Sequence, residues 1–211
     1  MCVERGFEMT DYREDMEPLL SVMVKPRETF RFMIDNKKFT YALYTGAVAG
    51  VASMLITMYG TAFPVGFGLG DVVYSSIVTG ILVFMLTNLV LAFVLAKVGT
   101  MLKGKGTFKE MFQTVCMANA PYFWVMPIVL FWLQNAAHTF FKFDFNIETS
   151  IRDMIWAYVG LFSVAVAAIW SVVLSIVGIS EVHQFSKWKG FAVFLLGSLT
   201  VLAVNVLLLT I

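Results

Sequence analysis

The chain has 211 residues, of which 59% are hydrophobic and only 14% are charged, and its formal net charge is +1. Soluble domains carry roughly 25% charged residues, so this composition excludes an ordinary soluble globular protein. With a charge this close to neutral, no nucleic-acid partner is expected.

Long stretches without a charged side chain follow one another along the chain. Because an apolar run of about 18 residues or more can cross a bilayer, and a helix pairs its own backbone groups there, these stretches predict transmembrane helices. The charge-free runs are residues 39–70, 72–96, 111–141, 154–180 and 190–211. The fold class predicted is all-α: a polytopic membrane protein with a bundle of five transmembrane helices in one domain, residues 18–211. The spans are expected at about 39–62, 72–97, 112–137, 154–180 and 190–211.

The segment before the first span has two parts. Residues 1–17 are acidic and are expected to form a mobile, solvated tail. Pro26 suits the first turn of a helix, and Phe30, Met33 and Ile34 would share one face of that helix. We expect this cytoplasmic amphipathic pre-span helix to lie on the inner membrane surface; the alternative is a soluble cap on the bundle.

Glycines in the first span predict close helix packing. Gly46 and Gly50 stand four residues apart, a spacing that lets another helix approach closely. Within one polytopic chain this spacing favours an intramolecular contact over a dimer. At the start of the second span, Asp71 stands where it can serve as the N-cap.

The third span carries a start signal and a possible break. Thr107 and Glu110 form a capping box, which predicts a helix start just before the span. Pro121 and Pro127 each remove a backbone hydrogen bond and can kink the helix. Pro121, two residues after Asn119, is a candidate hinge; the alternative is a proline that a membrane helix simply tolerates.

Lysine and arginine are distributed unevenly over the expected loops. If the N-terminus is cytoplasmic, the inner segments hold 13 of the 15 basic residues, and only Lys142 and Arg152 lie outside. Cytoplasmic loops carry this excess in membrane proteins. We therefore expect an inner N-terminus and, after five spans, an outer C-terminus.

Sequence motifs that would indicate nucleotide binding, metal binding or catalysis are weak or missing. The stretch Gly99–Gly106 matches the opening of a phosphate-binding loop, but Gly106 stands where Ser or Thr should reach Mg²⁺, and an apolar span precedes it. We interpret it as a flexible basic connection able to touch anionic headgroups. His138 and His183 are expected on opposite sides of the membrane, each as an interfacial polar residue, so they cannot share a metal. No cofactor, no metal and no catalytic residue is expected, and the chain is not interpreted as an enzyme.

The polar side chains within the spans are amides and hydroxyls. The lack of ionisable groups there argues against proton or ion transport. Interhelical hydrogen bonding is the default role of such groups. The alternative is a channel or carrier for a small neutral or lipid-like solute, with Asn88, Asn119 and the break at Pro121 lining its path.

Several local patterns resemble the Yip1-domain family of membrane proteins. Residues 26–30 (P-R-E-T-F) are similar to the P-x-E-T-F element of this family, and residues 104–110 (G-K-G-T-F-K-E) to its inner loop. Ala120-Pro121 falls at its break in the third span, and residues 169–190 resemble its ending. The resemblance begins near Leu19 and covers nearly the whole chain.

This resemblance implies a five-helix membrane domain with a cytoplasmic N-terminus, in a short prokaryotic-type member of the plasma membrane. Eukaryotic relatives associate with Rab-type GTPases through longer N-terminal regions. This chain has only 38 residues before its first span and lacks a D-L-Y-G-P-like element, which argues against a GTPase partner. Some prokaryotic members appear as partners of ABC-type exporters.

The resulting hypothesis is an adaptor or scaffold that binds membrane lipids and other membrane proteins, an ABC-type exporter among them. Its cytoplasmic surface is expected to be built from the pre-span helix and both inner connections. The residues expected there are Pro26, Arg27, Phe30, Gly104, Gly106, Thr107, Phe108, Glu110, His183 and Trp188. Helix packing or hinge motion is the role expected of Gly46, Gly50, Asn119 and Pro121.

Overall fold

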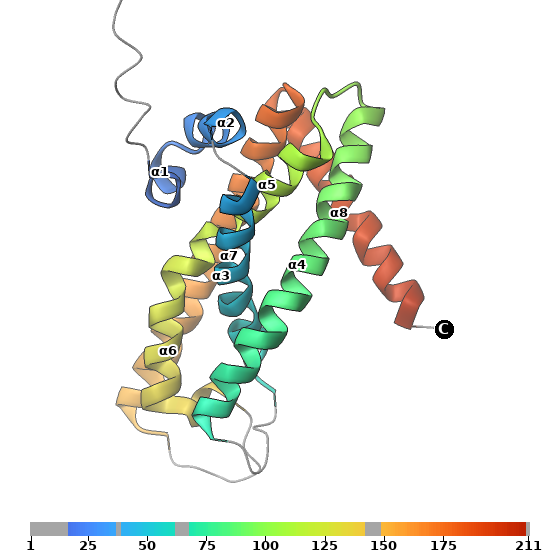
Figure 1. The fold of residues 1–211 in the computed structure, drawn as a ribbon. Helices are drawn as coiled ribbons and strands as arrows, with labels where there is room; N and C mark the ends of the chain where they lie inside the picture. Colours follow the sequence, from blue (N-terminus) through green and yellow to red (C-terminus); the bar gives the residue numbers. More distant parts are fainter. Residues whose placement is uncertain (1–16, 37–38, 62–67, 142–148, 210–211) are drawn as a thin grey trace, which may run out of the picture.

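The computed structural model describes residues 17–36, 39–61, 68–141 and 149–209, and the regular structure in them is helical (Figure 1). The helices are α1 (Pro18–Val24), α2 (Pro26–Asn36), α3 (Phe39–Thr57), α4 (Leu69–Met101), α5 (Phe108–Ala118), α6 (Ala120–Phe140), α7 (Ile151–His183) and α8 (Lys187–Leu209). Counting α5 and α6 together, five segments of the described residues are long and apolar enough to cross a membrane, which confirms the predicted fold class. The expected acidic tail lies outside the described residues, except for Glu17.

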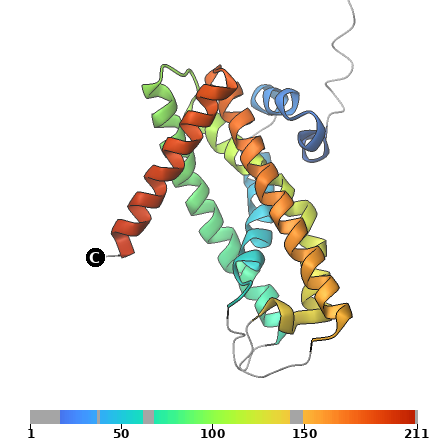
Figure 2. The same ribbon diagram turned by 180° about the vertical axis from the view of Figure 1, so that it is seen from behind.

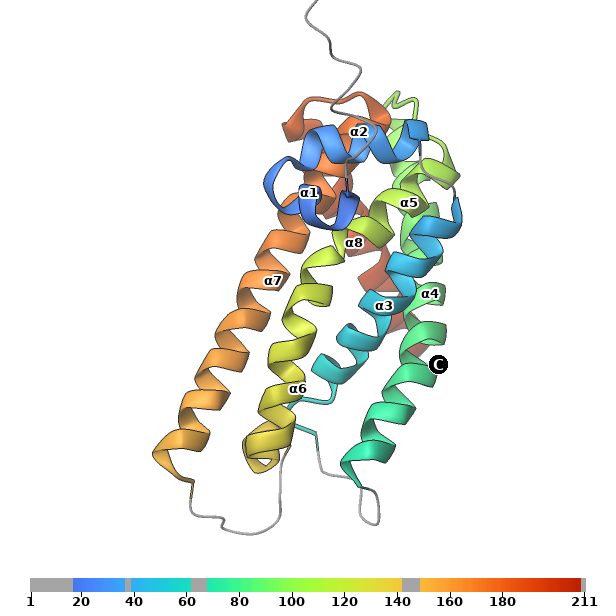
Figure 3. The same cartoon turned by 60° about the vertical axis from the view of Figure 1, so that its left-hand side comes forward.

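The long helices form an elongated bundle, and the two short N-terminal helices lie across one of its ends (Figures 1 and 3). The connections from α4 to α5 and from α7 to α8 are at this same end, which we call the α2 end. Seen from behind, α8 runs from the α2 end and leans away from the other helices (Figure 2). The two N-terminal helices and these two connections, which are far apart in the sequence, therefore lie at one end of the bundle.

Helix starts and breaks differ in detail from the sequence-based expectation. The Asp71 prediction is wrong: α4 begins at Leu69, and the Asp71 carboxylate reaches back to accept from the Gly68 N–H at 2.8 Å. The third span is two helices, because α5 ends at Ala118 and α6 starts at Ala120, with Asn119 as the cap residue between them. A carboxylate in the first turn can accept a hydrogen bond from the N–H of the cap residue, so it stabilises the start of the helix as a cap side chain does.

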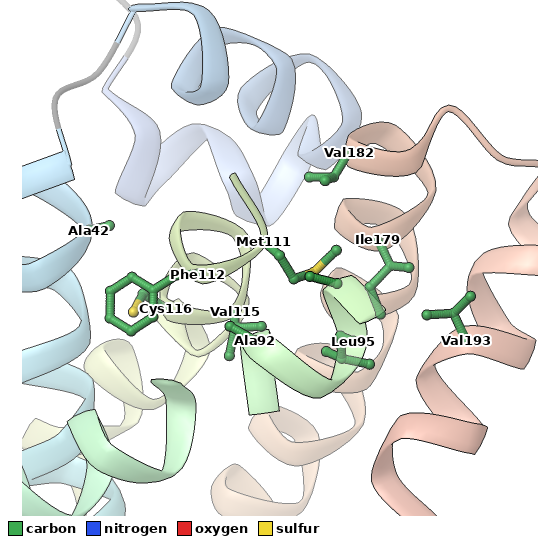
Figure 4. Close-up of a cluster of buried hydrophobic side chains, with 11 residues drawn as sticks. Ala42, Ala92, Leu95, Met111, Phe112, Val115, Cys116, Ile179, Val182 and Val193 are labelled. Atoms are coloured by element: carbon green, nitrogen blue, oxygen red, sulfur yellow. The ribbon is translucent and has the colours of Figure 1, made fainter. Parts of the chain in front are cut away.

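A cluster of buried apolar side chains fills the α2 end of the bundle (Figure 4). Leu95 of α4, Met111 of α5 and Ile179 of α7 are each 1% exposed or less and meet there. A second cluster, around Trp132 and Phe140, packs the opposite end. Because lipid is as apolar as these side chains, close packing rather than water exclusion holds the helices together.

The glycine pair in α3 brings that helix close to two others of the same chain. A Cβ on Gly50 would lie 2.7 Å from the Gly80 carbonyl oxygen of α4. A Cβ on Gly46 would lie 2.9 Å from Sγ of Cys116 in α5. Both glycines therefore face intramolecular partners, at distances that no larger residue permits without movement.

The apolar face of α2 contacts protein, in contrast to the favoured expectation of a helix lying on the membrane surface. Phe30 is 0% exposed and Met33 is 1% exposed, and both belong to a cluster that includes Met117 and Leu174. The Phe30 ring also approaches Gly178 of α7. The membrane-surface expectation is wrong for these two side chains, and α2 caps the bundle.

Candidate functional site

The ends of α4 and α7 have the same local geometry. After α4, Lys103 adopts a left-handed conformation (φ 67°), its N–H bonds to the Thr100 carbonyl, and the Gly104 N–H bonds to the Gly99 carbonyl, both at 2.9 Å. After α7, Gln184 takes the same role with φ 56°. This pair of bonds is the Schellman motif, which satisfies carbonyls that the helix itself leaves unpaired.

Glycine occupies the two positions of the α4 motif that usually carry contacting apolar side chains. In place of that contact, the imidazole of His183 lies between Gly99 and Gly104. A Cβ on Gly99 would lie 2.1 Å from His183 Nε2, and a Cβ on Gly104 would lie 2.4 Å from His183 Nδ1. We call this arrangement the histidine slot.

His183 links α7 to the connection between α4 and α5. Its Nδ1 accepts a hydrogen bond from the Gly106 N–H at 3.2 Å, and its ring stacks on Phe185 with centroids 5.4 Å apart. An accepting Nδ1 places the proton of the neutral ring on Nε2. At 1% exposed, His183 is buried among protein atoms.

A carboxylate at the last turn of α7 holds α2 in place. Glu181 accepts from Arg27 Nε through one oxygen and from Arg31 Nη2 at 2.8 Å through the other. The Glu181 side chain is only 9% exposed, whereas those of Arg27 and Arg31 are 68% and 55% exposed. The carboxylate is therefore held inside while both guanidiniums reach the surface.

These side chains form one wall of a pocket of about 490 Å³ at the α2 end, which we call the arginine–glutamate pocket. α2 contributes Arg27, Arg31 and Asp35, and α5 contributes Glu110. The end of α7 completes it with residues from 180 to 185 other than His183. Charges of both signs thus converge from three segments separated by up to about 150 positions in sequence.

The predicted surface residues do not all line the arginine–glutamate pocket. Arg27 and Glu110 line the pocket, while Gly104, Gly106 and His183 form the support behind it. Pro26 begins α2 and Phe30 is buried beneath that helix. The capping box is present, since Thr107 Oγ1 accepts from the Glu110 N–H and Glu110 accepts from the Thr107 N–H. Phe108 lies away from the pocket, on a groove beside α4, and Trp188 is 83% exposed.

Sequence reasoning missed the residues that complete this site. Arg31 and Glu181 were not singled out, although a carboxylate directly after a charge-free run, with arginines in the pre-span helix, is a signal for such a pair. Gly99 appeared only within the rejected phosphate-loop pattern, yet its lack of a Cβ makes room for the histidine.

The residues assigned to a transport path are engaged with one another. Asn119 Nδ2 lies 3.4 Å from Asn88 Oδ1 and 2.8 Å from the Val115 carbonyl, and Asn88 Nδ2 donates to the Phe84 carbonyl at 2.7 Å. Pro121 is buried in the first turn of α6. Hydrogen-bonded amides fit the default packing role, and the transport alternative gains no support from them.

Two further observations concern metal binding and the second histidine, His138. The described residues contain no group of three or more His, Cys, Asp or Glu side chains able to hold a metal ion. His138 lies near the end of α6 that is remote from α2, with its Nε2 3.4 Å from an Asp153 oxygen.

Comparison with known proteins assigns the family. A family model described as the Yip1 domain matches residues 20–209, nearly the entire chain. No curated protein and no solved structure matches the chain. The chain belongs to the Yip1 domain family, which consists of non-enzymatic membrane proteins, and it is a multi-pass integral membrane protein.

Proposed function

We propose that this member of the Yip1 domain family is an adaptor or scaffold that binds a membrane partner through the arginine–glutamate pocket, with the α2 end facing the cytoplasm. The observation that carries this proposal is the pocket itself, which collects charged side chains from α2, α5 and α7 at one surface. The excess of lysine and arginine in the segments at this end supports the orientation.

The charges in the pocket favour a polar protein segment as the occupant. Each guanidinium has five N–H donors, and the contacts with Glu181 use one nitrogen of Arg27 and one of Arg31. The remaining donors suit carbonyl or carboxylate oxygens of a partner, while Asp35 and Glu110 suit its N–H groups. A cytoplasmic segment of another membrane protein offers both kinds of group, and an ABC-type exporter is the partner class that we propose testing first.

Site-specific photo-cross-linking in native membranes tests the proposal. A photoreactive amino acid at position 184, which lines the pocket, is expected to give a discrete product heavier than the monomer. The same group at position 187, three residues further along and outside the pocket lining, is the matched control. Identical products from both positions, or monomer alone from position 184, would refute the pocket as the binding surface.

A charge reversal adds a second readout. Asp35→Lys changes the charge of the pocket without replacing a member of the Arg27–Glu181–Arg31 contact. The cross-link from position 184 is expected to fall several-fold in this variant, while thermal unfolding in detergent stays close to that of the native chain. Persistence of the full cross-link would contradict an electrostatic role for the pocket.

A further inference from the structure

A second concave surface lies beside α4 and shares no lining residue with the arginine–glutamate pocket. It is a groove of about 390 Å³ whose walls include Leu89, Phe93 and Phe108, and Lys97 and Gly106 also line it. We call it the lysine groove. Partner binding as proposed above does not use it.

The walls of this groove are aromatic and well supported. The rings of Phe93 and Phe108 lie edge to face with centroids 6.5 Å apart, and the two residues are 52% and 40% exposed. Phe108 also packs on Phe112, which is 2% exposed and fixed in the bundle. Two partly exposed rings backed by a buried one make a stable apolar surface for an alkyl chain.

One lysine lines the groove, and three more are close to its lining residues in the sequence. Lys97 Nζ lies 5.7 Å from the centroid of the Phe93 ring, so its ammonium stands directly beside the apolar wall. Lys103, Lys105 and Lys109 follow in the connection and the first turn of α5, and all three are exposed. From residue 97 to residue 110 the sequence has one acidic side chain, that of Glu110, which is bonded within the capping box.

The depth of the groove agrees with this combination of apolar walls and lysines. Lys97 is one turn before the end of α4, a membrane-spanning helix that ends at Met101. Hydrocarbon meets the headgroup layer near the end of a span, where lysine places its ammonium at the phosphates and its stem along apolar surface. A ligand that fills the groove from the bilayer must have an alkyl chain and a negative headgroup within a short distance of each other.

We propose that the lysine groove binds one anionic phospholipid of the adjoining leaflet. Its phosphate contacts Lys97, with the lysines of the connection adding to the attraction, and an acyl chain lies between Phe93 and Phe108. Basic residues near a bilayer attract anionic lipids in general. The aromatic walls beside Lys97 hold one acyl chain, so we expect one bound lipid per chain.

Native mass spectrometry of the full chain in a mild detergent tests this site. Dioleoyl-phosphatidylglycerol is expected to remain bound at one molecule per chain, at concentrations where dioleoyl-phosphatidylcholine is lost. Lys97→Gln is expected to weaken the retention of phosphatidylglycerol about fivefold, the effect of one lysine at a membrane surface. Phe108→Ala is expected to weaken both lipids without changing the preference between them.

Lys189→Gln is the matched control, because Lys189 Nζ lies 5.5 Å from the Phe185 ring centroid at the same end of the bundle but outside the groove. This variant is expected to retain phosphatidylglycerol within twofold of the native chain. Equal weakening by the two lysine variants, or equal retention of the two lipids, would overturn the proposal. Displacement of the lipid by glycerol 3-phosphate would also overturn it, since that compound has the charge without the chains. Thermal unfolding of each variant verifies that it is folded.

Discussion

The histidine slot predicts that Gly99→Ala destabilises the native protein but stabilises a variant that lacks the His183 ring. In the native chain, a Cβ on Gly99 would lie 2.1 Å from Nε2 and 2.3 Å from Cε1 of His183. The ring cannot retreat freely, because it is bonded to the Gly106 N–H and stacked on Phe185. Overpacking costs about 1–3 kcal/mol, and this fixed contact belongs at the upper end. Alanine is better than glycine inside a helix by about 1 kcal/mol, so Gly99→Ala is expected to destabilise the protein by about 2 kcal/mol.

Removal of the ring should reverse this result. In a His183→Ala background the steric conflict is gone, and Gly99→Ala is expected to stabilise by about 1 kcal/mol through helix propensity alone. The difference between the two backgrounds corresponds to a coupling of about 3 kcal/mol, at the high end for residues in contact.

Thermal unfolding in detergent, followed by tryptophan fluorescence, measures all four proteins of the cycle. At roughly 2–4 °C per kcal/mol for a chain of this size, Gly99→Ala should lower Tm by roughly 4–8 °C in the native background and raise it by roughly 2–4 °C beside His183→Ala. Gly70→Ala, in the same helix but with nothing within 4 Å of the new Cβ, should shift Tm equally in both backgrounds. An equal decrease from Gly99→Ala in both backgrounds would refute the slot.

Three further substitutions probe the same end of the molecule. Glu181→Gln should loosen the attachment of α2 to α7, and the expected loss of stability is about 1 kcal/mol because both arginines are more than half exposed. Trypsin cleavage after Arg27 should therefore accelerate about fivefold. Glu28→Gln, on the same helix, should leave the cleavage rate unchanged. Lys103→Gly should raise Tm by stabilising the folded state by about 0.5–1 kcal/mol, because it removes a Cβ from a left-handed position; a lower Tm would contradict that conformation. A Cβ on Gly106 would lie 2.3 Å from Cγ1 of Val182 in the wall of the arginine–glutamate pocket. Gly106→Ala should therefore reduce both the cross-link from position 184 and the retention of phosphatidylglycerol. Native values of both would contradict the inference that Gly106 supports both surfaces.

The spans and the local helix signals could be predicted because they depend on neighbouring residues. Five charge-free runs are enough to specify five membrane helices, since hydrocarbon leaves the backbone no other way to pair its polar groups. The capping box likewise depends on two residues only three positions apart, Thr107 and Glu110. Pro26 begins α2 for the same local reason, its missing N–H costing nothing in a first turn.

The parts that depend on contacts between distant segments could not be predicted. The sequence shows that Phe30 and Met33 share a face, but lipid and protein offer that face the same apolar surroundings, so periodicity cannot distinguish them. His183 is an ordinary polar residue at a span end until Gly99 and Gly104, about 80 positions away, provide space for its ring. Glu181 is likewise an ordinary surface carboxylate until the two arginines of α2 enclose it.

The histidine slot also bears on how the two proposed binding surfaces relate. Gly106 lines the lysine groove, and the histidine that holds Gly106 stands between Val182 and Gln184, which line the arginine–glutamate pocket. Energetic coupling between two sites requires an element with two alternative arrangements. The connection here is fixed by a Schellman motif, a buried hydrogen bond and a ring that fills the space left by two glycines. A lipid in the groove and a partner in the pocket are therefore expected to be held at a constant spacing, which is how a scaffold acts, rather than to compete or cooperate as in a switch.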